Sequence, residues 1–218
     1  MIEMKNISKK VGNKVILDDI SLKIDEGSFV VFIGPSGCGK TTTLKLMNKL
    51  ISPTSGEIYI DDKPISKEDP IKLRRNIGYV IQSIGLFPHL TIRENIELIP
   101  KLKKEKSHEE IEKSTIELMN MVGLNPNEFL DKYPSELSGG QQQRTSIGRA
   151  LITRPTIVLA DEPTGNLDSK SSDEIVALLK KSNKELKQTI IMITHNLEIA
   201  KMADRIIKIE DGKIVSEA

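Results

Sequence analysis

The chain has 218 residues, of which 38% are hydrophobic and 29% charged, and its formal net charge is +1. This length and composition are typical of one domain with a sizeable core. The near-zero net charge gives no electrostatic case for a nucleic-acid surface, so we expect no nucleic-acid partner. The single cysteine, Cys38, excludes an intrachain disulfide and fits a reducing cytoplasm. We recognise no signal peptide and no apolar run near the roughly 20 residues that cross a bilayer, so another polypeptide is expected to span any membrane involved.

Short strand patterns fill the first 82 residues. Three segments alternate apolar and polar residues, as half-buried antiparallel strands do: Met1–Ile7, Lys14–Ile24 and Gly56–Ile60. Ser28–Ile33 instead contains four consecutive apolar residues, which is typical of a strand buried on both faces of a mostly parallel sheet. A helix is predicted to follow at Lys40–Leu50. The first part of the chain therefore predicts a buried parallel strand beside an antiparallel flank.

The middle of the chain, from about residue 83 to residue 154, has a helical pattern. Ser107 and Glu110 have the spacing of a capping box, and apolar residues recur at helical intervals after them. We find no internal repeat and no low-complexity linker in this part or elsewhere. The middle segment is therefore predicted to be a helical insertion rather than a separate unit joined by a linker.

The last part of the chain returns to alternating strands and helices. Thr156–Ala160 and Thr189–Thr194 are β-branched apolar runs, and each precedes a turn and a helical pattern. Together with the first part, this predicts an α/β fold with a mostly parallel core sheet and an antiparallel β flank. We predict a single domain over residues 1–218, in which 1–82 and 155–218 form a catalytic core and 83–154 form the helical subdomain.

Gly34–Thr41 fits the phosphate-binding pattern G-x-x-x-x-G-K-[ST], between a buried strand and a helix. Glycines allow successive N–H groups to face an anion, and the helix N-terminus adds a partial positive charge. Lys40 would reach the β- and γ-phosphates, and the Thr41 hydroxyl would ligate Mg²⁺. The residues predicted to contact ATP here are Gly34, Ser36, Gly37, Cys38, Gly39, Lys40, Thr41 and Thr42.

Hydrolysis also needs a carboxylate for the Mg²⁺ shell and a group that positions or deprotonates water. At the end of the apolar run after Thr156, Asp161 would bind the metal and Glu162 would act on the water. If the chain had no phosphate loop, these two acidic residues could equally be explained as caps of the next turn. His195 and Gln82 also follow apolar runs, so all four are expected at the carboxyl ends of strands. His195 suits a γ-phosphate or the water, and Gln82 can reach both Mg²⁺ and water.

A second glycine-rich element, Leu137–Gln141, reads Leu-Ser-Gly-Gly-Gln and precedes another helical pattern. Such a helix start suits an anion. One phosphate loop needs only one such element for its own nucleotide, so this one is predicted to serve the nucleotide of a second copy of the chain. A two-fold dimer would then contain two composite sites.

These motifs resemble those of ABC transporter ATPases. They occur in the family's order: the phosphate loop, Gln82, the Leu137–Gln141 signature, Asp161-Glu162, Asn166-Leu167-Asp168 and His195. The resemblance implies an ATPase with ATP and Mg²⁺ as cofactors, in which Lys40 and the loop amides bind phosphates. It implies that Thr41, Gln82 and Asp161 hold Mg²⁺, that Glu162 is the general base, and that His195 senses the γ-phosphate. It further implies that Ser138, Gly139, Gly140 and Gln141 contact ATP across a head-to-tail dimer, which Asp168 bridges.

The resemblance also implies a membrane partner. Ser83–Asn95 matches the loop that docks on an integral-membrane permease, so the chain is expected to be cytoplasmic and peripheral on the cytoplasmic face of the cell membrane. Val11 departs from the pattern, because the family usually stacks adenine on an aromatic residue at this position. Since aromatic stacking contributes on the order of 1 kcal/mol, we expect GTP to compete nearly as well as ATP.

Two segments resemble different subfamilies. Ile81–Leu90 resembles importers of glycine betaine, choline or carnitine, whereas Ala160–Asp168 resembles ATPases of lipoprotein release and antimicrobial-peptide export. Because coupling specificity lies near Ser83–Asn95, import of a quaternary-ammonium osmolyte is favoured, with a solute-binding protein left open as a further component. Either exporter, or a cell-division type of membrane complex that moves no cargo, is the alternative. The signature disfavours a nucleotide kinase.

Overall fold

The computed structural model of the protein describes residues 1–218. Its strands form a four-stranded sheet in the order β2-β1-β4-β5 and a six-stranded sheet in the order β10-β9-β3-β8-β7-β6. The strands are β1 (Ile2–Val11), β2 (Lys14–Ile24), β3 (Phe29–Ile33), β4 (Ser55–Ile60), β5 (Lys63–Pro64), β6 (Ile77–Val80), β7 (Ile157–Asp161), β8 (Thr189–Ile193), β9 (Arg205–Glu210) and β10 (Lys213–Glu217).

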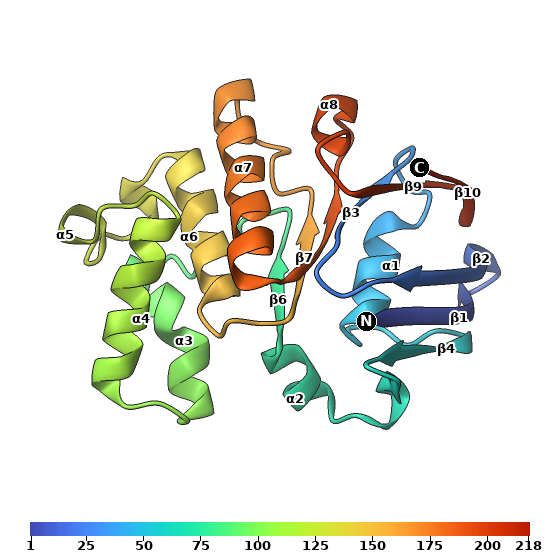
Figure 1. Ribbon diagram of the computed structural model, residues 1–218, viewed down its shortest axis with the longest axis horizontal. Helices are drawn as coiled ribbons and strands as arrows, with labels where there is room; N and C mark the ends of the chain where they lie inside the picture. Colours follow the sequence, from blue (N-terminus) through green and yellow to red (C-terminus); the bar gives the residue numbers. More distant parts are fainter.

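The helices are divided between the two halves of the molecule (Figure 1). They are α1 (Lys40–Met47), α2 (Pro70–Arg75), α3 (Ile92–Lys103), α4 (His108–Met121), α5 (Pro126–Phe129), α6 (Gly139–Leu151), α7 (Ser169–Leu186) and α8 (Leu197–Ala200), with 3-10 turns at Ile65–Lys67 and Pro134–Glu136. In Figure 1, α3 to α6 gather in the left half and both sheets lie to their right. None of the helices combines the length and apolar character needed to cross a bilayer.

The six-stranded sheet is parallel from β9 to β6, and only the edge strand β10 is antiparallel. This confirms the predicted parallel core and antiparallel flank. Because β3, β6, β7 and β8 run the same way, the loops that follow them leave the sheet at one edge. These loops are the ones that contain the phosphate loop, Gln82, Glu162 and His195, so the strand directions bring the predicted site residues to the same edge.

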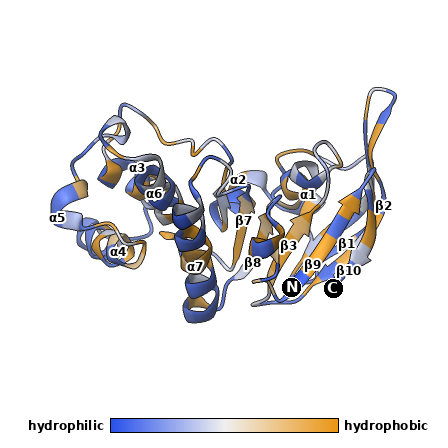
Figure 2. Ribbon diagram, turned by 90° about the horizontal axis from the view of Figure 1, so that it is seen from above, coloured by the Kyte–Doolittle hydropathy of each residue, from blue (hydrophilic) through white to orange (hydrophobic).

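Strand β3 is buried on both faces, as its unbroken apolar run predicts. Phe29 and Val31 pack in a core that contains residues of α4, α6 and α7, whereas Val30 and Phe32 pack in a second core with the antiparallel sheet and α1. In Figure 2, β3 is coloured hydrophobic, while the outer helix α7 carries both colours. The two cores hold the end of β3, and therefore the start of the phosphate loop, from both sides.

The helical middle of the chain begins its helices as the sequence indicates. At α4, the Ser107 hydroxyl accepts from the Glu110 backbone N–H at 3.2 Å, and the Glu110 carboxylate accepts from the Ser107 N–H at 2.8 Å. This confirms the predicted capping box. Helix α6 contacts α3, α4, α7 and β6, so it joins the helical half of the molecule to the edge of the sheet.

Candidate active site

The phosphate loop curls between β3 and α1 because its glycines allow backbone conformations that other residues avoid. Gly34 has φ +145°, and a Cβ there would lie 2.0 Å from the Ile209 carbonyl oxygen. Lys40 is only 5% exposed. Its Nζ donates to the carbonyl oxygens of Gly34 and Pro35, each at 2.8 Å. The ammonium group therefore sits over the loop, and bound phosphate oxygens would replace these carbonyls as its acceptors.

The remaining residues of this loop separate into an exposed tip and a buried base. Ser36 and Gly37 are exposed, whereas Cys38 and Gly39 are buried. The Cys38 side chain is 5% exposed and lies 3.8 Å from Lys40 Nζ. The backbone of the tip is thus the part of the loop that solvent or a ligand can reach.

A buried carboxylate lies next to the start of α1. The Thr41 hydroxyl donates to Asp161 Oδ1 at 2.9 Å, which joins the first turn of α1 to the end of β7. Burial raises the pKa of Asp161, and the nearby Glu162 charge raises it further, while the Thr41 hydrogen bond opposes both effects. The structure therefore brings together two of the three predicted metal ligands, Thr41 and Asp161, at the end of the phosphate loop, while Gln82 bonds Glu162 instead.

Tyr79 of β6 lies beside Asp161, a neighbour that the sequence pattern does not indicate. Burial raises the pKa of Tyr79, and the Asp161 charge adds to this effect. The strand register explains the contact: Tyr79 pairs with Leu159, two residues before Asp161, so all three side chains are on one face of the sheet. Only the β6–β7 pairing could have revealed this residue.

Both carboxylate oxygens of Glu162 have a partner from another strand end. His195 Nε2 lies 2.7 Å from Oε1, and Gln82 Nε2 donates to Oε2 at 2.8 Å. Glu162 has φ +48°, a left-handed conformation that costs a residue with a side chain about 1–2 kcal/mol. Such strain is typical of functional positions. The structure thus joins Glu162, His195 and Gln82, the three residues predicted to act on water or the γ-phosphate.

The signature element lies away from this cluster. Ser138 caps α6, where its hydroxyl accepts from the Gln141 N–H at 3.4 Å and its own N–H donates to Gln141 Oε1 at 2.9 Å. Ser138 and Gly139 are exposed, and Gly140 is half-buried. In Figure 1, α6 belongs to the left half and α1 to the right half. The chain therefore does not fold the signature onto its own phosphate loop.

Two further predicted contacts lie on the surface. Asp168 caps α7 and accepts hydrogen bonds from the backbone N–H and the hydroxyl of Ser171 at 2.9 and 2.8 Å, which hold the pKa of Asp168 below its usual range. Val11 ends β1 at the tip of the β1–β2 hairpin and is 63% exposed. An exposed apolar side chain at this tip fits a base-contacting position but supplies no aromatic ring.

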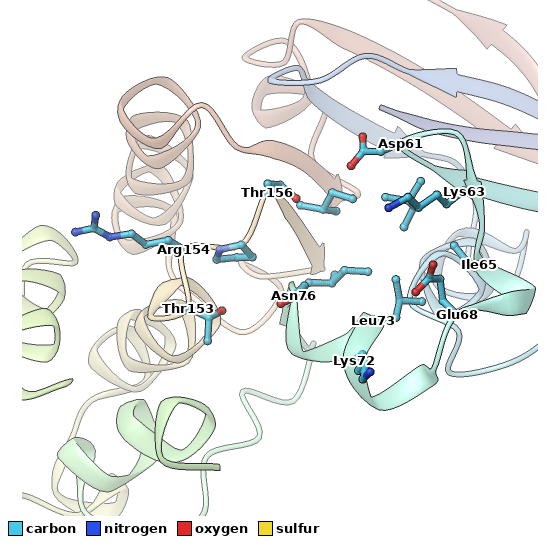
Figure 3. Close-up of a pocket in the computed structure, with 14 residues that line it drawn as sticks. Asp61, Lys63, Ile65, Glu68, Lys72, Leu73, Asn76, Thr153, Arg154 and Thr156 are labelled. Atoms are coloured by element: carbon cyan, nitrogen blue, oxygen red, sulfur yellow. The ribbon is translucent and has the colours of Figure 1, made fainter. Parts of the chain in front are cut away.

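Three cavities bear on where a ligand or a partner could bind. One of about 330 Å³ opens beside Glu162 and His195. Another, of about 360 Å³, lies between the edge strand β6 and α3, where Phe87 and Leu98 line it. A third, of about 380 Å³, lies at the amino ends of β6 and β7, opposite the predicted site (Figure 3).

The third cavity is a mixed-charge groove. Figure 3 shows Lys63 and Glu68 on the side of α2, while Arg154 points away from them. The lining side chains carry both signs of charge and do not converge on one point, so we place no nucleotide site there.

The donor set at Thr41 and Asp161 fits Mg²⁺. A hydroxyl and a carboxylate supply the hard oxygen ligands that Mg²⁺ prefers, and Gln82 can add an amide oxygen. No group of three or more His, Cys, Asp and Glu side chains that could hold a metal ion forms anywhere in residues 1–218. A cation at this position would thus share its ligands with nucleotide phosphates, as Mg²⁺ does in phosphoryl-transfer sites.

Comparison with known proteins identifies relatives over the whole chain. The family model for the ABC transporter matches residues 17–165. The carnitine transport ATP-binding protein OpuCA of Listeria monocytogenes is 53% identical over 99% of this chain and 54% of its own length. The choline transport ATP-binding protein OpuBA of Bacillus subtilis is 49% identical over 99% of this chain and 56% of its own length. The chain thus spans about half the length of these curated relatives.

A solved structure gives the same architecture. The dimeric post-hydrolysis state of the ATP-binding cassette MJ0796 of Methanocaldococcus jannaschii, bound to ADP and Pi, matches with a TM-score of 0.90 and 42% identity. This match covers 100% of this chain and 98% of the archaeal chain. This match confirms the predicted fold over the whole of this chain.

Proposed function

The chain belongs to the ABC transporter family, and from this premise we propose that it is an ATP-hydrolysing motor subunit of a membrane transporter. The observation that supports hydrolysis most directly is the geometry around Glu162. A carboxylate held by Gln82 and His195, beside the Thr41–Asp161 pair and the phosphate loop, supplies a base, a water-positioning group and a metal site at one edge of the sheet.

We assign the binding roles as follows. The amides of the phosphate loop and Lys40 bind the β- and γ-phosphates, and Thr41, Asp161 and Gln82 hold Mg²⁺. Mg²⁺ held by these residues would supply positive charge that stabilises the charge developing on the phosphates. Val11 contacts the base without stacking on it. The chain therefore binds the triphosphate tightly but distinguishes ATP from GTP only weakly.

Glu162 takes the proton from the attacking water in this proposal. In the structure each of its oxygens has a partner, because Gln82 donates to Oε2 and His195 Nε2 lies 2.7 Å from Oε1. A Gln82 side chain that ligated Mg²⁺ instead would leave Oε2 available to the water. His195 keeps Glu162 oriented through Oε1 and lies where it can also reach the γ-phosphate.

Glu162→Gln tests this assignment. The variant should bind ATP but lose about 10²- to 10⁴-fold in kcat, the usual contribution of a general base. In size-exclusion chromatography with ATP, the variant should also elute as a dimer, because hydrolysis no longer opens the closed dimer. Glu198→Gln, an exposed change a few residues beyond His195, is the matched control. A Glu162→Gln protein with wild-type turnover would remove Glu162 from the base role, and an inactive wild-type protein would refute the ATPase.

The second copy of the chain completes each site in our proposal. Ser138, Gly139, Gly140 and Gln141 contact the nucleotide held by the partner's phosphate loop, and Asp168 lies between the two sites. Two observations support this: the signature is exposed and remote from the chain's own phosphate loop, and the related archaeal cassette is dimeric in its structures.

We further propose that a permease docks beside the Ser83–Asn95 segment, which places the chain on the cytoplasmic face of the cell membrane. The 360 Å³ groove between β6 and α3 supports this location. Phe87 is 41% exposed at its rim, and Leu98 and Ile99 add apolar surface, while Arg74 and Arg75 supply positive charge. An amphipathic helix of the membrane partner with acidic residues at its border would fit this groove.

Import of a quaternary-ammonium osmolyte is the transport function that we propose. Relatives named as ATP-binding proteins of carnitine, choline or glycine betaine transport or uptake are 40–53% identical to this chain, which supports the importer over the exporters. A strain that lacks the chain should fail to recover in high salt with glycine betaine, and the intact chain, but not Glu162→Gln, should restore recovery. Equal recovery without the chain would refute osmolyte import but leave the ATPase proposal standing.

A further inference from the structure

Helix α6 holds the loop that follows Gln82 through two side chains. The Ser146 hydroxyl donates to the Ile84 carbonyl oxygen at 2.9 Å. Arg149 donates from Nη1 to the Gly85 carbonyl oxygen at 2.7 Å and from Nη2 to that of Ile84 at 3.3 Å. One helix therefore binds two consecutive carbonyls of the loop, which are about 60 residues away in sequence.

The loop at this place has a strained backbone. Ile84 has φ +63°, and a β-branched residue is a genuine outlier in the left-handed region. The next residue, Gly85, has φ +61°, and a Cβ there would lie 2.3 Å from Ile81 Cδ1. Strained conformations persist only where the surroundings over-determine them. Ser146 and Arg149 supply such surroundings, because they bind the Ile84 carbonyl, which belongs to the Ile84–Gly85 peptide, and the Gly85 carbonyl, which belongs to the next peptide.

Arg149 is half-buried and has no carboxylate within 4 Å as an ion-pair partner. Burial lowers its pKa. Its hydrogen-bond partners are the two loop carbonyls, and its guanidinium group lies 6.0 Å from the centre of the Phe87 ring. A half-buried guanidinium group whose hydrogen-bond partners all belong to one loop is better explained by the position of that loop than by general stability.

We propose that Ser146 and Arg149 are positioning residues for Gln82, and that they tie the place of Gln82 to the helix that starts at the signature. Gln82 lies two residues after the end of β6 and two residues before Ile84. Its backbone is thus fixed to the sheet on one side and to α6 on the other. Helix α6, 13 residues or about 20 Å long, is stiff enough to transmit a displacement of its signature end to this loop.

This proposal rests on the roles given above to Gln82 and to the signature. Its consequence concerns the closed dimer. When the nucleotide held by the partner packs against Ser138, helix α6 would shift, and this shift would move Ile84, Gly85 and Gln82 relative to Glu162. Binding at one composite site would then affect the metal ligand of the other. In this proposal the Ile84–Gly85 turn is the element that moves, and its backbone is strained in the conformation that the α6 contacts hold.

The far half of the loop is held independently, which makes the test local. Asn95 is fully buried and donates to the carbonyl oxygens of Phe87, Leu90 and Thr91, and it accepts from the Phe87 N–H. Loss of the α6 contacts should therefore loosen the segment before Phe87 and leave the segment after it in place.

Amide hydrogen exchange of the nucleotide-free full chain tests the contact itself. In Arg149→Lys and in Ser146→Ala, the amides of Ile84 and Gly85, which donate to the Ile81 and Ser83 carbonyl oxygens, should exchange about tenfold faster or more, since a hydrogen bond that holds this turn is weakened or lost. Arg144→Lys is the matched control, because Arg144 lies on the same helix and binds the Val122 carbonyl oxygen and Glu174 instead. If Arg149→Lys changes exchange no more than Arg144→Lys does, the proposal is wrong.

Kinetics test the position of Gln82. Arg149→Lys should raise the Mg²⁺ concentration that gives half-maximal ATPase activity several-fold, while the affinity for ATP measured without Mg²⁺ stays at the wild-type value. A purely structural role predicts a lower melting temperature with an unchanged Mg²⁺ requirement, and this result would also overturn the proposal. The exchange experiment does not depend on enzymatic activity. An inactive wild-type protein would therefore refute the ATPase proposal, and hydrogen exchange would still test the contact between α6 and the loop.

Discussion

The Asp161 carboxylate is expected to lower the stability of the folded protein while acting as a ligand of Mg²⁺. Because burial raises its pKa, the folded protein binds this proton more tightly than the unfolded chain. The ionised carboxylate therefore destabilises the fold above the folded-state pKa, and this effect disappears below the ordinary value of 3.8. We predict that Asp161→Asn raises the melting temperature of the nucleotide-free protein by a few degrees at neutral pH, and removes Mg²⁺-dependent ATPase activity.

Thermal denaturation at several pH values measures this effect. The gain from Asp161→Asn should shrink as the pH falls towards 3.8, because the wild-type carboxyl is then also neutral. Asp131→Asn, whose side chain is 89% exposed in the wild type, should show little change at any pH. A lower melting temperature of Asp161→Asn at neutral pH would mean that the contacts of the carboxylate, above all the Thr41 hydrogen bond, outweigh the burial of its charge.

At the scale of elements, α4 and α6 begin with the same capping box but have different neighbours. Ser107 and Ser138 each accept from the N–H three residues on, and both side chains are exposed. Replacing either with Ala should lower the free energy of unfolding by about 1 kcal/mol. Only Ser138→Ala should also reduce ATPase activity and ATP-dependent dimerisation, because only α6 starts at the signature. Urea denaturation and steady-state assays of both variants separate the two effects, and equal activities would argue against the trans contact.

At the scale of the whole molecule, composite sites make two inactive variants complementary. Lys40→Ala removes the phosphate grip, and Ser138→Arg blocks the signature, so each should be inactive alone. In an equal mixture about half of the dimers are mixed, and each of these has one intact site, so roughly a quarter of wild-type activity should return. Steady-state ATPase assays of the mixture measure this. If mixing restores nothing, each chain carries its own complete site or the dimer does not exchange.

Much of the fold could be read from local patterns. The unbroken apolar run of β3 indicates burial on both faces, and alternation indicates the antiparallel flank, because side-chain periodicity depends on neighbouring residues alone. The capping boxes and the glycines of the phosphate loop are equally local, since Gly34 needs its backbone conformation whatever packs around it. Family resemblance then added the roles of residues whose types and order match.

Strand order could not be read in this way, and it decides the contacts of the site. Placing β7 between β8 and β6 brings His195 and Gln82 to opposite oxygens of Glu162, which lies 33 residues from one and 80 from the other. The same pairing brings Tyr79 to Asp161. No periodicity records such contacts, because they depend on which strands pair rather than on how each strand is patterned.

The sequence by itself determined that this chain has a phosphate loop, two carboxylates at a strand end, and a signature that precedes a helix. The tertiary structure alone decided which of these meet. It joined Thr41 to Asp161 and enclosed Glu162 between two side chains, and it kept the signature away from the chain's own phosphate loop. The physical reason is that local geometry is fixed by adjacent residues, whereas contacts between distant segments depend on how the whole chain buries its apolar faces.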